Sequence, residues 1–185
     1  MATAAKAIIT AEEFMAMDLG EGTFELVRGE VIELPPAMPE HGLVCGNTAI
    51  ILGTYGRQTG YGYMLCNDSA VQTERGPDTV RGADVSFYSQ ARWPRSEVGR
   101  RLPPIAPDLV VEVFSPGNRA GEMLGKVQEY LDAGVLMVWV IHPVRRTLAI
   151  YRPDDPTPTV LTATDTLENL PELPGFRCPV AEFFV

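Results

Sequence analysis

The sequence lacks the long apolar runs that mark membrane and exported proteins. None of its 185 residues falls in a stretch near the roughly eighteen apolar residues of a membrane span. The N-terminus carries only Lys6 as a charge before Ile9 and has no apolar signal-peptide core. We therefore expect a cytoplasmic protein. The length suits a single domain spanning residues 1–185, large enough to bury a proper core.

Cysteine and histidine are scarce. Cys45, Cys66 and Cys178 stand far apart, and no Cys-X-X-Cys pair or Cys/His cluster is visible. A structural zinc site needs four such ligands, usually in closely spaced pairs, so none is expected. We expect each cysteine to be reduced and partly buried, as free cysteines commonly are.

Positive charge is also in deficit. Lysine and arginine together number 15 against 24 acids, which gives a net charge of −9. Electrostatic binding of long nucleic acids needs several phosphate contacts from basic residues. The charge balance counts against that mode, although arginines cluster within residues 92–101 and 145–152. Solvated loops balanced by nearby acids explain these clusters equally well. No phosphate-binding GxxxxGK(S/T) segment and no GxSxG nucleophile motif occurs.

The patterns that are present predict a mixed α/β chain. Thr10 and Glu13 form a capping box that opens a short helix, expected to end near Gly20. Helices and strands then alternate irregularly. We expect a β-hairpin over residues 23–34, a helix over 41–58, strands over 61–72 and 80–88, a long loop over 89–107, a strand over 109–114, a helix over 120–133, strands over 135–141 and 147–151, and short closing strands. The strand, helix and strand after residue 109 imply a parallel crossover.

Two acidic residues interrupt strands that otherwise read as buried. Glu112 lies in an apolar run from Leu109 to Phe114, and Asp84 lies in a shorter one. An ionised carboxylate is costly to bury alone, so such residues pair, protonate or hold a metal. Neighbouring strands lie about 4.8 Å apart, so facing carboxylates could chelate one cation. Asp108 shares the face of Glu112 but lies about 13 Å along the strand, too far to share an ion.

Lys126 lies in the helix that follows the Glu112 strand. Its flexible stem could reach back over the sheet end, where an ammonium could steady an attacking water or charge developing on phosphorus. A magnesium ion held by Asp84 and Glu112 would polarise a phosphate and acidify bound water. These residues predict a metal-dependent phosphodiesterase site. A structural ion pair for Glu112 and a solvated position for Lys126 remain open readings.

Several segments, taken in order, resemble a known bacterial family. They are FELVRGE (24–30), ADV (83–85), PDLVVEVFSP (107–116), KVQEY (126–130), AGV (133–135) and VWVI (138–141). The chain looks like a member of the Uma-type "putative restriction endonuclease" family, within the PD-(D/E)XK nuclease superfamily. The resemblance spans nearly the whole chain, and its motifs are specific only when taken together.

The resemblance implies a restriction-endonuclease-like core, a mixed central sheet flanked by helices, with an N-terminal helix and β-hairpin. It implies that Asp84 and Glu112 bind magnesium or manganese, that Lys126 is catalytic and that Glu25 adds a third carboxylate. DNA is the implied substrate, and the protein is expected to act as a homodimer.

The chain departs from the superfamily pattern at two places. The usual lysine lies two residues after the glutamate, where this chain has Phe114, so Lys126 on the following helix is expected to replace it. Ala83 stands where the superfamily has proline before the metal-binding aspartate. The leading function is therefore a magnesium-dependent endonuclease. The alternative is a nuclease-like fold that no longer cuts and serves as a binding or dimerisation module.

Two further residues have competing readings. Glu25 in the hairpin is read either as a surface strand residue or as part of the site. His41, at the expected start of a helix, is read either as a structural residue such as a cap or as a phosphate contact.

Overall fold

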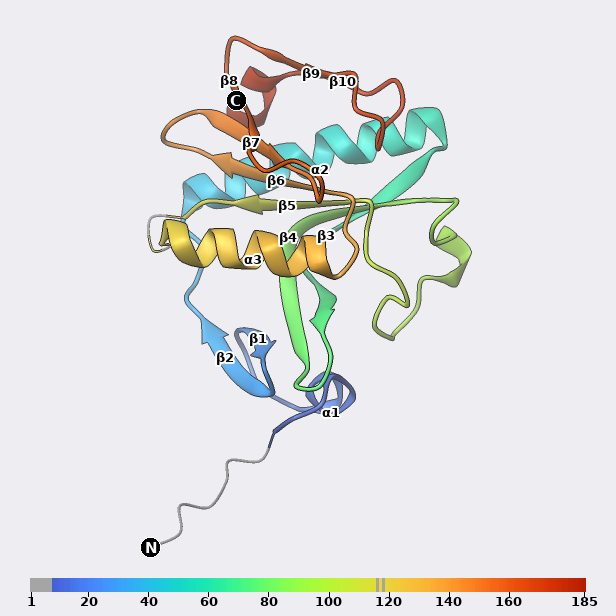
Figure 1. Ribbon diagram of the computed structural model, residues 1–185, viewed down its shortest axis with the longest axis vertical. Coiled ribbons are helices and arrows are strands. Elements are labelled where there is room, and N and C mark those ends of the chain that lie inside the picture. Colours follow the sequence, from blue (N-terminus) through green and yellow to red (C-terminus); the bar gives the residue numbers. More distant parts are fainter. Residues whose placement is uncertain (1–7, 116, 118) are drawn as a thin grey trace, which may run out of the picture.

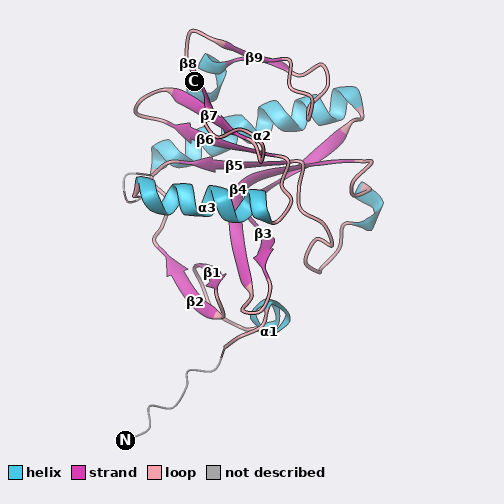
Figure 2. Ribbon diagram, in the orientation of Figure 1, coloured by secondary structure: helices cyan, strands magenta, loops and turns pink. Residues whose placement is uncertain are grey.

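A computed structural model describes residues 8–115, 117 and 119–185. Its helices and strands are drawn in Figures 1 and 2. The helices are α1 (Ala11–Ala16), α2 (Pro39–Thr59) and α3 (Ala120–Asp132), with 3-10 turns η1 (Arg95–Glu97) and η2 (Val180–Phe184). The strands are β1 (Thr23–Val27), β2 (Glu30–Leu34), β3 (Gly62–Glu74), β4 (Thr79–Ser89), β5 (Leu109–Val113), β6 (Met137–His142), β7 (Thr147–Tyr151), β8 (Thr159–Thr162), β9 (Thr166–Glu168) and β10 (Arg177–Pro179). None of the helices in the described ranges has both the length and the apolar character of a membrane span.

Strand β4 organises the main sheet. It pairs with β3 along one edge, and with β1 and then β5 along the other. Apart from β3, the strand order of this sheet is β2-β1-β4-β5-β6-β7-β8, and β9 and β10 form a separate two-stranded sheet. Strands β5 and β6 are parallel and are joined through α3, whereas the other pairs between described strands are antiparallel. The predicted mixed sheet, N-terminal helix and hairpin are thus confirmed.

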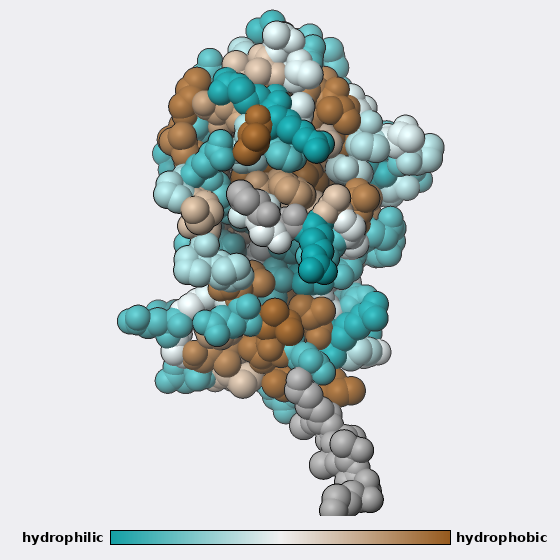
Figure 3. Space-filling view, turned by 90° about the vertical axis from the view of Figure 1, so that its left-hand side faces the viewer, coloured by the Kyte–Doolittle hydropathy of each residue, from teal (hydrophilic) through white to brown (hydrophobic). Residues whose placement is uncertain are grey.

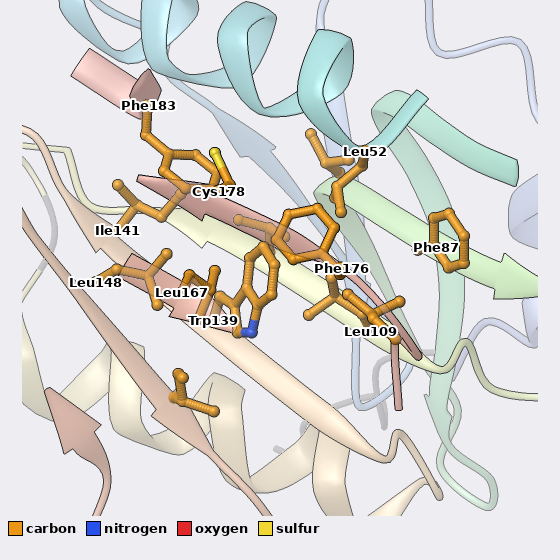
Figure 4. Packing of buried hydrophobic residues seen from close by; sticks show 14 of the residues in the cluster. Leu52, Phe87, Leu109, Trp139, Ile141, Leu148, Leu167, Phe176, Cys178 and Phe183 are labelled. Atoms are coloured by element: carbon orange, nitrogen blue, oxygen red, sulfur yellow. The ribbon is translucent and has the colours of Figure 1, made fainter. Parts of the chain in front are cut away.

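The sheet is covered on both faces (Figure 1). Helix α2 and the C-terminal segments pack on one face, where the core contains Leu52, Trp139 and Phe183 (Figure 4). Helix α3 packs on the other face. Alternation along β5 turns Val111 toward α2 and Val110 toward α3. Glu112 has the parity of Val110 and therefore faces α3.

Two helix boundaries differ from the predictions. Helix α1 ends at Ala16, before the expected stop near Gly20. Helix α2 begins at Pro39, where proline loses no hydrogen bond because the first amides of a helix have no helical partner. His41 consequently lies inside the first turn of α2 and does not cap it.

Asp108 contacts Ser89, the last residue of β4, and lies away from Asp84. Its carboxylate accepts hydrogen bonds from the Ser89 amide at 2.8 Å and the Ser89 hydroxyl at 3.0 Å. This buried residue therefore has a structural role at the strand entrance.

All three cysteines are free. Cys45 is partly buried and Cys178 is buried, as expected, but Cys66 is exposed because it lies beside a bulge in an edge strand. Figure 3 shows apolar surface gathered over the lower part of the molecule, where Figure 1 places α1 and the β1–β2 hairpin.

Candidate active site

Asp84 and Glu112 face each other across two paired strands. The β4–β5 register matches Val85 with Val111, and its continuation by one residue sets Asp84 opposite Glu112. Asp84 Oδ2 accepts a hydrogen bond of 2.6 Å from the Val113 amide, which fixes the carboxylate at the strand end. Both acids line a cavity of about 330 Å³, which is also lined by His41 in the first turn of α2 and Glu122 in the first turn of α3. Figure 1 shows these two helix ends on the left.

Lys126 reaches this pair from α3. Its Nζ lies 3.0 Å from Glu112 Oε2 and 3.1 Å from Glu25 Oε1, and it donates to the Gly82 carbonyl at 3.4 Å. Burial alone would lower the pKa of Lys126, but the Glu112 and Glu25 carboxylates outweigh burial and raise this pKa above its ordinary value. The ammonium is therefore charged at neutral pH. The expected reach of Lys126 back to Glu112 is present. We expected this lysine early in the helix, but it lies in the middle of α3.

Glu112 has a second partner that the sequence analysis missed. The buried Tyr130 hydroxyl donates to Glu112 Oε1 at 2.7 Å. Burial raises the pKa of Glu112 to about 7, even though Lys126 and Tyr130 act in the opposite direction. Tyr130 lies four residues after Lys126, so both side chains lie on one face of α3. That spacing was a usable signal for their shared contact.

Glu25 is buried, with 3% of its surface exposed, so the surface reading of this residue is wrong. Its Oε1 accepts from the Gly82 amide at 3.1 Å, and its Oε2 accepts from Arg81 at 2.8 Å. Burial raises the pKa of Glu25, but Lys126 and Arg81 together bring it below its ordinary value. Glu25 does not line the cavity, but it contacts Lys126, which does. Arg81 is itself held by a bidentate contact with Glu129 at 2.7 and 2.8 Å.

Asp68 is a third acidic residue of the cavity that the sequence analysis did not find. It lies in a bulge of β3, where Asn67 and Asp68 have φ values of 66° and 53°. A bulge re-aims side chains, so the alternation of a regular strand does not reveal which way Asp68 points. Gly82 makes room for it, because a Cβ there would lie 2.9 Å from Asp68 Cβ. Burial and the charge of Asp84 raise the pKa of Asp68.

His41 connects α2 to the cavity. Its Nε2 lies 3.3 Å from Asp84 Oδ2, and this hydrogen bond raises the pKa of His41 above its ordinary value. Cys45 lies one helical turn later, with its Sγ 3.4 Å from His41 Nδ1. Donor atoms of His41, Cys45 and Asp84 lie within 4.8 Å of one another, the one such three-residue group in the described part of the chain. The prediction that no cysteine–histidine cluster exists is therefore wrong. His41 and Cys45 lie one helical turn apart on α2, and the packing of α2 on the sheet brings Asp84 of β4 to them.

The geometry agrees with a family assignment from sequence. The sequence model of the Uma2 family, described as "Putative restriction endonuclease", matches residues 11–181. The chain belongs to the Uma2 family. The matched span includes Glu25, Asp84, Glu112 and Lys126, and the expected resemblance is confirmed. No curated protein matches the chain.

A solved structure agrees with the fold of this Uma2 protein. The crystal structure of a "putative nuclease belonging to DUF820" from Anabaena variabilis ATCC 29413 matches with a TM-score of 0.80 and 20% sequence identity. The match covers 95% of this chain and 97% of the other. At that identity the similarity establishes a shared fold.

The donor atoms of the Uma2 cavity suit a hard divalent cation. Asp68, Asp84 and Glu112 present carboxylate oxygens to one water-accessible space, and oxygen ligands are those that Mg²⁺ and Mn²⁺ prefer. Four acids line this space, since the exposed Glu122 joins these three, and the nearby positive charges are Lys126 and His41 when it is protonated. A divalent cation would relieve the repulsion among these acids.

Proposed function

We propose that this Uma2 protein is a divalent-metal-dependent endonuclease of the PD-(D/E)XK type that hydrolyses DNA phosphodiester bonds. The observation that carries the proposal is the position of Lys126, whose ammonium lies 3.0 Å from Glu112 in the cavity that Asp84 also lines. The Uma2 family is described as "Putative restriction endonuclease" and the Anabaena protein as a "putative nuclease", and both descriptions support the same reaction class.

Asp84 and Glu112 would hold Mg²⁺ or Mn²⁺ in this proposal. The ion would polarise the scissile phosphate and lower the pKa of a bound water. Lys126 orients the attacking water and stabilises negative charge on the phosphate oxygens through its ammonium protons. Glu25 keeps that ammonium charged and positioned from behind. His41 and the Val113 amide fix the Asp84 carboxylate.

The replacement of the usual strand lysine has a geometric explanation. Phe114, at the usual lysine position, stacks on His142 with ring centroids 4.8 Å apart and has no group for proton transfer or charge stabilisation. Instead, Lys126 lies on α3, which packs on the face of the sheet to which Glu112 points. Its ammonium therefore contacts Glu112 from the helix. The chemistry needs the ammonium at this point and does not depend on which element supplies it.

Cleavage of DNA by the purified chain tests the proposal. With Mg²⁺ or Mn²⁺ the wild type should nick supercoiled plasmid, and Glu112→Gln should abolish nicking while keeping the side-chain shape. Asp155→Asn, at an exposed position outside the cavity, is the matched control and should cut normally. Cleavage by Glu112→Gln at the wild-type rate would refute the assignment.

The second candidate function is a nuclease-like module that binds or dimerises without cutting. The observation that favours it is the satisfied state of Glu112, since one oxygen bonds Lys126 and the other bonds Tyr130. Such a closed network is also what a structural ion pair would look like. Calorimetry separates the two functions. Heat of Mn²⁺ binding that disappears in Asp84→Asn supports the nuclease, and no binding at millimolar metal supports the inert module.

We also propose that the protein acts as a homodimer. Support comes from exposed apolar residues of the N-terminal part, among them Met15, Met17 and Ile32. Contiguous apolar surface of this kind often marks an interface. Light scattering should give twice the chain mass, and Ile32→Glu should shift the mass toward one chain. A single-chain mass for the wild type at micromolar concentration would contradict the proposal.

A further inference from the structure

Cys45 lies beside His41 and has no part in the proposed hydrolysis. The two residues are four positions apart on α2, so their side chains lie on one face of the helix. Cys45 Sγ and His41 Nδ1 are 3.4 Å apart. Two ligands of one tetrahedral zinc ion, at about 2.3 Å for sulfur and 2.0 Å for nitrogen, lie roughly 3.5 Å apart. The pair already has this separation.

Asp84 supplies the third ligand atom from β4. One oxygen of Asp84 lies within 4.8 Å of Cys45 Sγ and of a ring nitrogen of His41. Asp84 contacts His41 Nε2 and Cys45 contacts Nδ1, so the imidazole must turn for one ring nitrogen to face both residues across a bound ion. His41 and Asp84 also line the water-accessible cavity, which leaves room for water as a fourth ligand. Three protein ligands and one open position form a common zinc arrangement.

The donor types select a different ion from the one that the acidic residues prefer. Sulfur and imidazole are preferred by Zn²⁺ and other late transition metals, whereas Mg²⁺ prefers oxygen ligands. A thiol must lose its proton to act as a strong ligand, and the proton would pass to solvent as the ion binds. Burial and the nearby acids raise the pKa of the Cys45 thiol and oppose a free thiolate, but a divalent cation neutralises the thiolate that binds it.

We propose that His41, Cys45 and Asp84 form a binding site for a thiophilic divalent ion, with Zn²⁺ as the representative, and that this ion inhibits DNA cleavage. The inhibition rests on the proposed nuclease function, because Asp84 belongs to both sites. When Asp84 binds the thiophilic ion it is withdrawn from the oxygen-ligand site shared with Glu112. Cleavage would therefore stop while zinc is bound and resume after chelation.

Cobalt binding tests the site without any need for DNA. The full chain, kept reduced, is titrated with Co²⁺, and the thiolate-to-cobalt charge-transfer band in the near ultraviolet is recorded. One equivalent should saturate the band in the wild type, and the band should be absent in Cys45→Ser and Cys45→Ala. Cys66→Ser is the matched control, because Cys66 is exposed and outside the group, and it should keep the band. Circular dichroism shows that each variant is folded.

The results distinguish failure of the thiophilic-ion site from failure of the nuclease function. A cobalt band that persists in a folded Cys45 variant, or that disappears in Cys66→Ser, overturns the site. In a cleavage assay with excess Mg²⁺, the zinc concentration for half-inhibition should rise at least tenfold in Cys45→Ser, and an unchanged value overturns the inhibitory role. If the band behaves as expected but no preparation cuts DNA, the metal site stands and the nuclease function fails.

Discussion

The ammonium of Lys126 lies between two buried carboxylates, 3.0 Å from Glu112 and 3.1 Å from Glu25. The positive charge of Lys126 is thus shared by Glu112, which lines the cavity, and Glu25, which does not. The chain has two lysines and thirteen arginines, so most of its basic residues are arginines and Lys126 is an exception. A compact ammonium with three donors fits two carboxylates and the Gly82 carbonyl, whereas a planar guanidinium has a fixed fork geometry.

Replacing this cation should destabilise the fold. Lys126→Met leaves Glu112 and Glu25 buried without their shared partner, and we expect a loss of about 3 to 5 kcal/mol in the free energy of unfolding. Lys126→Arg keeps the charge but should recover only part of that loss, because the guanidinium does not fit the space. Urea unfolding measures both values. Equal stability of Lys126→Met and the wild type would show that the contact is weak.

The Tyr130 hydroxyl should position Glu112. Tyr130→Phe removes the 2.7 Å hydrogen bond and leaves a buried carboxylate oxygen without that donor, at an expected cost of about 1 to 3 kcal/mol. Tyr151→Phe is a control, because this partly buried tyrosine is on β7, and its change should be smaller. Thermal unfolding compares the two variants, and equal losses would contradict the role given to Tyr130.

Gly82 should tolerate no side chain. A Cβ at this position would meet Asp68 Cβ at 2.9 Å and the Asp68 carbonyl oxygen at 3.2 Å, both parts of the bulge that aims Asp68 at the cavity. We expect Gly82→Ala to destabilise the protein by about 1 to 3 kcal/mol. Gly121→Ala, in open space on α3, should be neutral or slightly stabilising. Chemical denaturation distinguishes the two, and similar values would mean that the bulge shifts freely.

Glu25 should make stability depend on pH in the acidic range. Lys126 and Arg81 overcome burial and lower the pKa of Glu25 in the folded protein below the ordinary 4.5. The unfolded state therefore binds the proton more readily, so this contribution is present above about pH 4.5 and is lost as the pH falls through the folded pKa. Glu25→Gln should be less stable than the wild type at pH 7, and the difference should shrink toward pH 3. Urea midpoints across this range test the sign, and a gap that widens on acidification would reverse it.

The sequence was enough to predict that Asp84, Glu112 and Lys126 meet, because strand alternation and the spacing of paired strands are regular. The apolar run of β5 marked Glu112 as a buried carboxylate, and the apolar pattern of β4 marked Asp84 as the acid to face it, as the strand register has them. The reach of Lys126 followed from the parallel crossover that carries α3 over the sheet end. These predictions needed only the alternation of side chains along a strand, the order of the elements along the chain and the length of a lysine side chain.

The remaining contacts could not be predicted because they depend on irregular backbone or on distant elements. Asp68 reaches the cavity through a bulge that breaks the period of two, although Asn67 and Asp68 are residue types that tolerate positive φ. The His41 contact with Asp84 depends on how α2 crosses the sheet, which no local pattern specifies. Glu25 looked exposed because hairpin strands often are, and its burial arises from Arg81 and α3 packing over it.

The most direct test is the rate of plasmid nicking by Lys126 variants in Mg²⁺ or Mn²⁺ under single-turnover conditions. The wild type should cut only when the metal is present. Lys126→Met, assayed where circular dichroism shows it folded, should lose at least about a hundredfold in rate, the usual effect of removing a transition-state donor. Metal-dependent cutting by the wild type together with this loss is the predicted result. Wild-type protein that never cuts, or a folded Lys126→Met that cuts at the wild-type rate, would contradict the account.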